Sequence, residues 1–190
     1  PVICHAGPFG NIAHGCSSIV ADRLALQTSE IAVTEAGFGA DLGFEKFMDI
    51  KVRQGGAEPS AAVLVATIKG LKWHGGIKQK ELTTPNIEAV SAGASNLKYA
   101  VATVRRYGLP VVVAINRFPE DTAEEIKVLQ DAAIEAGAAA AVEAKGFAEG
   151  GRGMTDLATK VVELLEADSV DIRLMYQDSE TIEEKITTLA

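Results

Sequence analysis

Three phenylalanines stand in short segments whose glycines and prolines are typical of loops. Phe38 lies in the triplet GFG, Phe118 precedes Pro119, and Phe147 begins the run FAEGG. Aromatic residues make up only 5% of the chain, so three loop rings are a notable share of them. An aromatic ring at the mouth of a site can stack on a flat heterocycle. We therefore predict a binding site for a planar ligand, with a second interpretation open for Phe38, which could fold back as a plug over the core.

Asn116 ends an apolar run two residues before Phe118. An amide beside a ring is well placed to hydrogen bond to the edge of a heterocycle that the ring stacks on. The alternative is local: Asn116 would cap the turn, and Phe118 would staple the helix that follows.

A glycine-rich segment, residues 10–17 (GNIAHGCS), has the glycine spacing of a phosphate-binding loop. Cys16 stands where such a loop has its lysine, so the charge that neutralises terminal phosphates is missing. The segment, with Asn11, either contacts phosphate directly or forms a tight turn between a strand and a helix. The motif G-x-x-x-x-G-K-[ST] does not occur in the sequence, so a cradle for a nucleoside triphosphate would lie outside this chain.

Residues 65–76 (VATIKGLKWHGG) bring together two lysines, the only tryptophan and one histidine. Two cations suit an anionic substrate, whereas the alternative is a solvated turn with Trp73 packed inward. Lys72 and His74, together with Asp41 of residues 35–43 (EAGFGADLG), are the candidates for catalytic roles. We expect no metal site, because His74 has no second ligand at the spacing that metal sites use.

Short apolar runs alternate along the chain with amphipathic stretches, which predicts a parallel sheet flanked by helices. The predicted strands are 2–5, 30–35, 61–68, 110–115 and 138–143, and the predicted helices are 17–29, 44–54, 84–107, 122–137, 154–167 and 179–190. Ligands of such α/β folds bind beyond the carboxyl ends of the strands. The loops that carry the three rings should therefore meet at one edge of the sheet.

The chain has 190 residues, 47% of them hydrophobic, and a formal net charge of −8. This length suits one α/β domain, and the negative charge argues against nucleic acid as a partner. No uncharged apolar run is long enough for a transmembrane helix. Two cysteines in a chain of this size indicate reduced thiols and a cytoplasmic protein. Because the chain begins with Pro1 directly before an apolar run, we expect 1–190 to be one α/β portion of a larger protein, with 168–190 the start of a further segment.

Several long motifs resemble the formate–tetrahydrofolate ligase (10-formyltetrahydrofolate synthetase) family. They are residues 7–15 (GPFGNIAHG), 33–43 (VTEAGFGADLG), 65–76, 114–119 (AINRFP) and 174–186 (LMYQDSETIEEKI). They occur in the family's order and cover essentially the whole chain. Two departures stand out: Lys69-Gly70 replaces the usual Arg-Ala, and Phe147 stands where the family commonly has Trp.

The resemblance implies an incomplete fold of the P-loop NTPase type with a helical C-terminal tail. It implies an ATP- and Mg²⁺-dependent enzyme of one-carbon metabolism, in which formyl phosphate made from formate and ATP transfers its formyl group to tetrahydrofolate. The residues it assigns to folate binding are Phe38, Phe118, Pro119 and Phe147, and those assigned to the nucleotide are Asn11 and Asn116. The phosphate cradle would belong to a missing N-terminal segment, and the complete enzyme would be a homo-oligomer, a tetramer in bacterial members.

Two other functions compete with that of a folate-side portion of a ligase. A non-catalytic module could hold a nucleotide or folate, or serve in assembly, only together with a partner chain. An NAD-linked oxidoreductase is excluded on motif, because Leu42 stands where the third glycine of a dinucleotide-binding fingerprint belongs.

Overall fold

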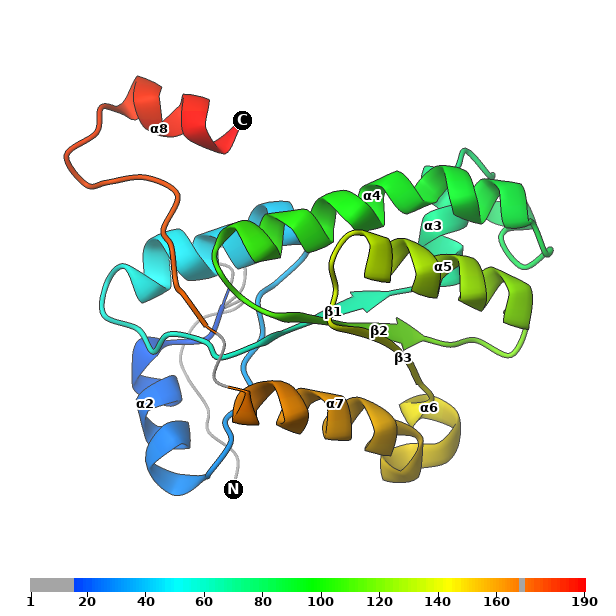
Figure 1. Cartoon of the computed structure of the whole chain (residues 1–190), viewed down its shortest axis with the longest axis horizontal. Coiled ribbons are helices and arrows are strands. Elements are labelled where there is room, and N and C mark those ends of the chain that lie inside the picture. Colours follow the sequence, from blue (N-terminus) through cyan, green and yellow to red (C-terminus); the bar gives the residue numbers. More distant parts are fainter. Residues whose placement is uncertain (1–15, 168–169) are drawn as a thin grey trace. The chain divides into compact units, whose positions relative to one another are not determined.

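The computed structural model describes residues 16–167 and 170–190 (Figure 1). The chain forms two compact units, each described here by itself. The sheet unit comprises residues 60–105 and 109–170, and the helical unit comprises residues 1–59, 106–108 and 171–190. The predicted strand at 2–5 lies outside the described residues.

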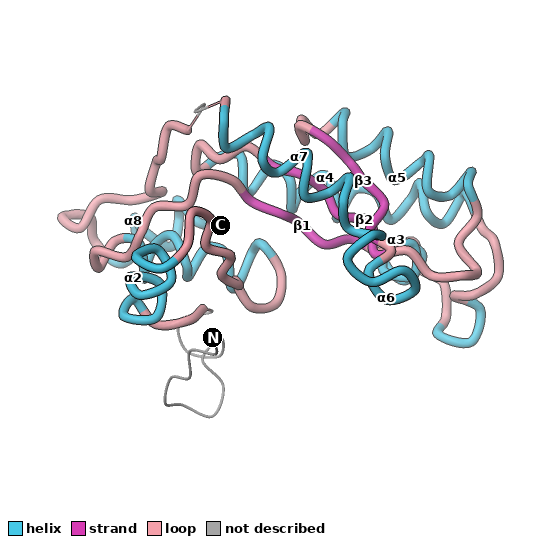
Figure 2. Tube along the Cα trace, turned by 90° about the horizontal axis from the view of Figure 1, so that it is seen from below, coloured by secondary structure: helices cyan, strands magenta, loops and turns pink. Residues whose placement is uncertain are grey.

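The sheet unit is built on three parallel strands, β1 (Ala62–Ala66), β2 (Val111–Asn116) and β3 (Ala140–Ala144), in the order β1-β2-β3. Figure 2 shows the central strand β2 between its two neighbours. The side chains of β2 are buried from Val111 to Ile115, as expected of a parallel strand covered on both faces. The predictions of a parallel sheet and of strands near 61–68, 110–115 and 138–143 are confirmed.

Helices flank this sheet on both sides (Figure 1). On one side are α3 (Ile68–His74), α4 (Ile87–Arg106) and α5 (Ala123–Glu135), and on the other is α7 (Thr155–Glu166). The short elements are η3 (Gln79–Glu81), α6 (Gly146–Glu149) and η4 (Gly150–Met154). Leu157 of α7 packs against Val112 and Ala114 of β2 in a buried apolar cluster.

The helix boundaries follow from capping. Thr122 caps α5 in a reciprocal capping box with Glu125, at the residue where the sequence predicts this helix to begin. The start of α4 differs from the predicted range of 84–107, because the helix begins at Ile87. The Oδ1 of Asn86 accepts a hydrogen bond of 2.9 Å from the N–H of Ala89, so Asn86 caps a helix that begins three residues later.

The helical unit contains α2 (Ile19–Thr28), two π-helical stretches, η1 (Ala40–Phe44) and η2 (Phe47–Val52), and α8 (Ile182–Leu189). The predicted strand at 30–35 is not formed. One isolated bridge, Cys16 to Ala36, stands beside this segment, and Val33 is 93% exposed. A strand needs a neighbour to pair its backbone groups, and no described strand lies beside residues 30–35.

A buried polar network joins distant parts of the helical unit. The Tyr107 hydroxyl donates to Asp49 at 2.5 Å, and Arg53 donates to the other oxygen of Asp49 at 3.0 Å. Arg53 also reaches the carbonyl of Tyr176 and the carboxylate of Asp178, both at 2.8 Å. Burial and the contact with Asp49 raise the pKa of Tyr107 well above its ordinary value. The C-terminal residues are thereby tied to the N-terminal half of this unit.

Tyr107→Phe is expected to lower the free energy of unfolding by about 1–2 kcal/mol. The substitution removes one hydrogen bond to a buried carboxylate while the ring keeps its edge-to-face contact with Phe44, whose centroid lies 5.3 Å away. Urea unfolding followed by circular dichroism measures the change. Tyr99→Phe is the matched control, since Tyr99 is half exposed, and an equal loss in both variants would contradict the role given to the Tyr107 hydroxyl.

Candidate ligand-binding site at the carboxyl edge of the sheet

The loops that follow the three parallel strands lie at one edge of the sheet, here called the carboxyl edge. It is formed by residues 67–69 after β1, 117–122 after β2 and 145–147 after β3. Two contacts link neighbouring loops: the N–H of Arg117 donates to the carbonyl of Ala144 at 3.3 Å, and Lys69 pairs with Glu120 at 2.5 Å. For the loops that carry Phe118 and Phe147, the expectation that they lie at one edge of the sheet is confirmed. The segment that carries Phe38 belongs to the helical unit.

Phe118 has a fixed backbone and a ring covered on one face. Its N–H donates to the Asp121 carboxylate at 2.8 Å, and its carbonyl accepts from the Asp121 N–H at 3.1 Å. Burial raises the pKa of Asp121, although the hydrogen bond from Phe118 acts in the opposite direction. The Lys69 ammonium lies 4.0 Å from the centroid of the Phe118 ring. This half-buried side chain is therefore held from both its backbone and its ring.

Phe147 lies on the next loop of the same edge and is fully exposed. The register of the sheet pairs Asn116 with Ala144, and the two rings follow these paired residues by two and three positions. Phe118 and Phe147 thus stand on adjacent loops. Pro119 is exposed beside Phe118. Thr122 caps α5, and Asp121 accepts the hydrogen bond from the Phe118 N–H at this turn.

Phe38 belongs to the helical unit and does not act as a plug, because its side chain is 72% exposed. It is the one non-glycine residue with a positive φ, 68°, in the part of the chain that the structure describes. The backbone at Gly43 passes so close to Gly37 that only glycine fits there. A Cβ on Gly43 would stand 1.6 Å from the carbonyl oxygen of Gly37. Asp41 of the same loop is exposed.

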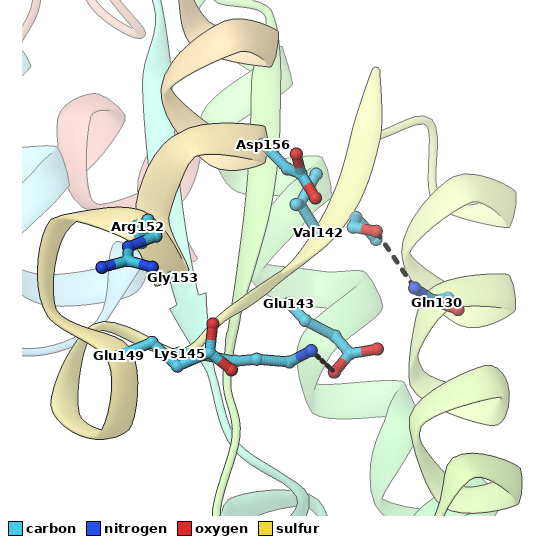
Figure 3. A pocket seen from close by; sticks show the side chains of 9 residues that line it. Gln130, Val142, Glu143, Lys145, Glu149, Arg152, Gly153 and Asp156 are labelled. Atoms are coloured by element: carbon cyan, nitrogen blue, oxygen red, sulfur yellow. Dashed lines mark hydrogen bonds and ion pairs between the residues drawn. The ribbon is translucent and has the colours of Figure 1, made fainter.

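A charged pocket of about 280 Å³ lies beside β3 in the sheet unit (Figure 3). Lys145 and Glu143 point toward one another, and Arg152, Glu149 and Asp156 also line it. Its lining includes neither of the two rings of this edge. A pocket lined by charges of both signs suits water or a polar group better than a flat heterocycle.

Glu143 ties this pocket to the carboxyl edge. It pairs with Arg117 at 2.5 Å and with Lys145 at 3.5 Å. Burial acts to raise the pKa of Glu143, but the two cations outweigh it and hold the pKa below its ordinary value. Glu143 is consequently ionised at neutral pH and keeps both cations in place.

Lys72 and the neighbouring candidates in α3 lie in contrasting environments. The Lys72 ammonium is 1% exposed and contacts Glu125 at 2.6 Å and the carbonyls of Leu82 and Thr84 at 3.2 and 3.0 Å. These three acceptors use all three of its N–H donors. Trp73, by contrast, is 57% exposed, so the expectation that it packs inward is wrong. His74 is exposed at the last residue of α3.

Two further positions belong to the segment that the sequence compares with a phosphate-binding loop. Asn11 lies outside the described residues. Cys16 is buried in the helical unit, where burial raises its pKa above the ordinary value, and Lys51 is buried nearby and pairs with Asp22. Within residues 16–167 and 170–190, no group of three His, Cys, Asp or Glu side chains could hold a metal ion, and no helix could cross a membrane.

Several contacts at the carboxyl edge were not foreseen from the sequence. They include the contact of Lys69 with the Phe118 ring and the pairing of Lys69 with Glu120. The pairing of Arg117 with Glu143 is a third. A partial signal existed: Lys69 directly follows the first long apolar strand, and Arg117 and Glu120 follow the next one. Opposite charges after neighbouring parallel strands are placed to pair across the edge.

Comparison with known proteins gives a match along the whole chain. The sequence model of the family described as formate–tetrahydrofolate ligase matches residues 1–190. Proteins named formate–tetrahydrofolate ligase from Sphingobium sp. and Granulibacter bethesdensis are 51% and 47% identical over 190 residues, and one from Lactobacillus acidophilus, named formate–tetrahydrofolate ligase 2, is 48% identical. Each alignment covers 100% of this chain but 33–34% of the relative. The chain spans about a third of the length of the curated relatives it matches.

Proposed function

Because the chain belongs to the formate–tetrahydrofolate ligase family, we propose that its carboxyl edge supplies the surface on which the ligase holds tetrahydrofolate. One observation carries this proposal. The two rings Phe118 and Phe147 follow adjacent strands from a paired position of the sheet, the first with a fixed backbone and the second fully exposed. A pterin can stack on rings presented in this way.

The complete ligase is a protein as long as the relatives that includes this chain. The reaction assigned to it has two steps. ATP, bound with Mg²⁺, phosphorylates formate to formyl phosphate, and N10 of tetrahydrofolate then attacks the formyl carbon, releasing phosphate and giving 10-formyltetrahydrofolate. The described residues contain no group suited to the metal, and the sequence lacks a phosphate-loop lysine motif. The phosphate cradle is therefore proposed to lie in polypeptide outside this chain.

The part proposed for this chain is to bind and orient the acceptor. Stacking on Phe118 and Phe147, with Pro119 alongside, would fix the plane of the pterin and exclude water from that face. Holding the acceptor in place removes much of the entropic cost of the transfer. Exclusion of water also protects formyl phosphate, a mixed anhydride that hydrolyses when exposed.

The same proposal includes further nucleotide-binding, folate-binding and catalytic residues. Asn116, at the end of β2, would hydrogen bond to the nucleotide base, and Asn11 would contact the nucleotide. Phe38 is proposed as a further folate-binding residue, and Asp41 and His74, both exposed, are the candidates for catalytic roles. Lys72 is omitted, because its three donors are already bound within the protein. The complete ligase is proposed to be a cytoplasmic homo-oligomer, a tetramer by its resemblance to bacterial members.

The purified 190-residue chain is expected to form no 10-formyltetrahydrofolate from ATP, formate and tetrahydrofolate. The reason is that the phosphoryl-transfer machinery is assigned elsewhere in the ligase. The measurement is a coupled assay in which acid converts the product to the absorbing methenyl form. The complete ligase is the positive control. Sustained turnover by the 190-residue chain would contradict the division of roles.

A further inference from the structure

We propose that Lys69 is a positioning residue for folate, whose ammonium covers one face of the Phe118 ring and leaves the opposite face to the pterin. This inference rests on the proposed function and deepens it.

The geometry joins two neighbouring loops through three side chains. Lys69 is the second residue of α3, and its place is fixed because Thr67, directly after β1, caps that helix by accepting a hydrogen bond of 2.9 Å from the N–H of Gly70. Its ammonium lies 4.0 Å from the Phe118 centroid and 2.5 Å from Glu120. The order of contacts is therefore acid, cation, ring.

The charges keep this arrangement in place at neutral pH. The hydrogen bond from Lys69 holds the pKa of Glu120 below its ordinary value, so Glu120 is a carboxylate at neutral pH. The side chains of Lys69 and Glu120 are each 29% exposed, which leaves the ammonium partly shielded from water. A cation over an aromatic face is attracted more strongly as water is removed.

A cation on one face has two consequences for a ligand on the other. The cation restricts rotation of the Phe118 side chain, so less conformational freedom is lost when a ligand stacks on the ring. It also attracts the electron density of the ring toward itself, which favours an electron-rich heterocycle on the opposite face. Both consequences strengthen folate binding without any contact between Lys69 and folate.

The test uses the complete ligase with Lys69→Met, which removes the charge and keeps the length of the side chain. The KM for tetrahydrofolate is expected to rise about two- to tenfold, while kcat and the KM for ATP stay within twofold. Lys69→Arg should restore most of the loss, because a guanidinium also stacks on an aromatic face. Glu120→Gln, which loosens the cation without removing it, should give a smaller rise.

A double-mutant cycle separates positioning from direct contact. In a Phe118→Leu background no ring remains to be held, so Lys69→Met should have no further effect on the folate KM. If the effect persists undiminished in that background, Lys69 contacts the ligand directly and the proposal is overturned. A lower folate KM in the Lys69→Met enzyme would overturn it as well, because it would show that the ammonium occupies the face the ligand needs.

Two controls keep the result interpretable. Lys160→Met removes an exposed lysine of α7 that pairs with Glu163, and it should leave all three kinetic constants unchanged. If Lys69→Met lowers the melting temperature, the comparison moves to Glu120→Gln, for which an unchanged folate KM would count against the proposal. The proposed function fails separately: Phe118→Ala without effect on folate removes the site itself, whereas an effect of Phe118→Ala without one of Lys69→Met removes only the positioning role.

Discussion

Phe118→Ala in the complete ligase is expected to weaken binding of tetrahydrofolate by about 1–3 kcal/mol, the range found for single rings stacked on a base. The substitution removes the face on which the pterin is proposed to stack, and it leaves the backbone hydrogen bond from residue 118 to Asp121 in place. ATP affinity should change little. The measurements are the KM for each substrate and the dissociation constant for tetrahydrofolate by calorimetry.

The control for Phe118→Ala is Tyr99→Ala, which removes a half-exposed ring from α4. Residue 99 lies in the middle of that helix, away from the three loops of the carboxyl edge. An unchanged folate KM in the Phe118→Ala enzyme would remove the stacking assignment. An equal rise in the KM for ATP and for folate would indicate general damage to the fold instead.

Lys72→Ala is expected to lower the free energy of unfolding of the sheet unit by about 3–5 kcal/mol, the usual cost of leaving one charge of a buried pair without its partner. Glu125 is 0% exposed and accepts hydrogen bonds from the N–H groups of Asn86 and Thr122 as well as from Lys72. Loss of the ammonium also leaves the carbonyls of residues 82 and 84 without that donor. Urea unfolding of the chain measures the effect.

Two observations would check this assignment of Lys72. Lys98→Ala breaks an exposed pair with Glu135 and should change stability by less than about 1 kcal/mol. Burial acts to raise the pKa of Glu125, but its hydrogen bonds lower it overall. Its stabilising contribution is therefore present above the pKa of about 4.3 of the unfolded chain and is lost as the pH falls through the lower folded value. A Lys72→Ala protein as stable as the wild type would contradict the structural role.

The strands of the sheet unit could be predicted because their sequences carry the signal in full. Residues 110–115 (PVVVAI) form an unbroken apolar run between turn residues, and only a strand covered on both faces fits such a run. Residues 30–35 (EIAVTE) have the same β-branched character, but strand formation depends on a neighbour. Pairing is a property of the fold, so propensity alone led to the wrong prediction there.

In helix α3, Lys72 is buried and its neighbour Trp73 is exposed. The buried residues of this helix are Ile68, Leu71 and Lys72, at the spacing of one helix face. Residue type favoured the alternative in which Trp73 packs inward, whereas helical periodicity buries Lys72 and exposes Trp73. The lysine is tolerated in the interior because Glu125, 53 positions later, supplies the matching charge, and no local pattern announces a partner at that distance.

The candidate site was predictable to the level of the loop and no further. The carboxyl-edge rule places Phe118 and Phe147 near one another once the strands are known to be parallel. The contact of Lys69 with the Phe118 ring depends on the register of β1 against β2 and on the rotamer of a long side chain. Neither quantity can be obtained from the spacing of residues along the chain.

The division of the helical unit among three stretches of chain affects how the protein can assemble during synthesis. Arg53 contacts Tyr176 and Asp178, which follow it by 123 and 125 positions, so these contacts form only after both residues have been translated. All residues of the sheet unit, 60–105 and 109–170, are translated earlier. N-terminal segments generally fold first as they emerge, whereas here the part of the helical unit around Arg53 is completed only after the whole sheet unit has been translated.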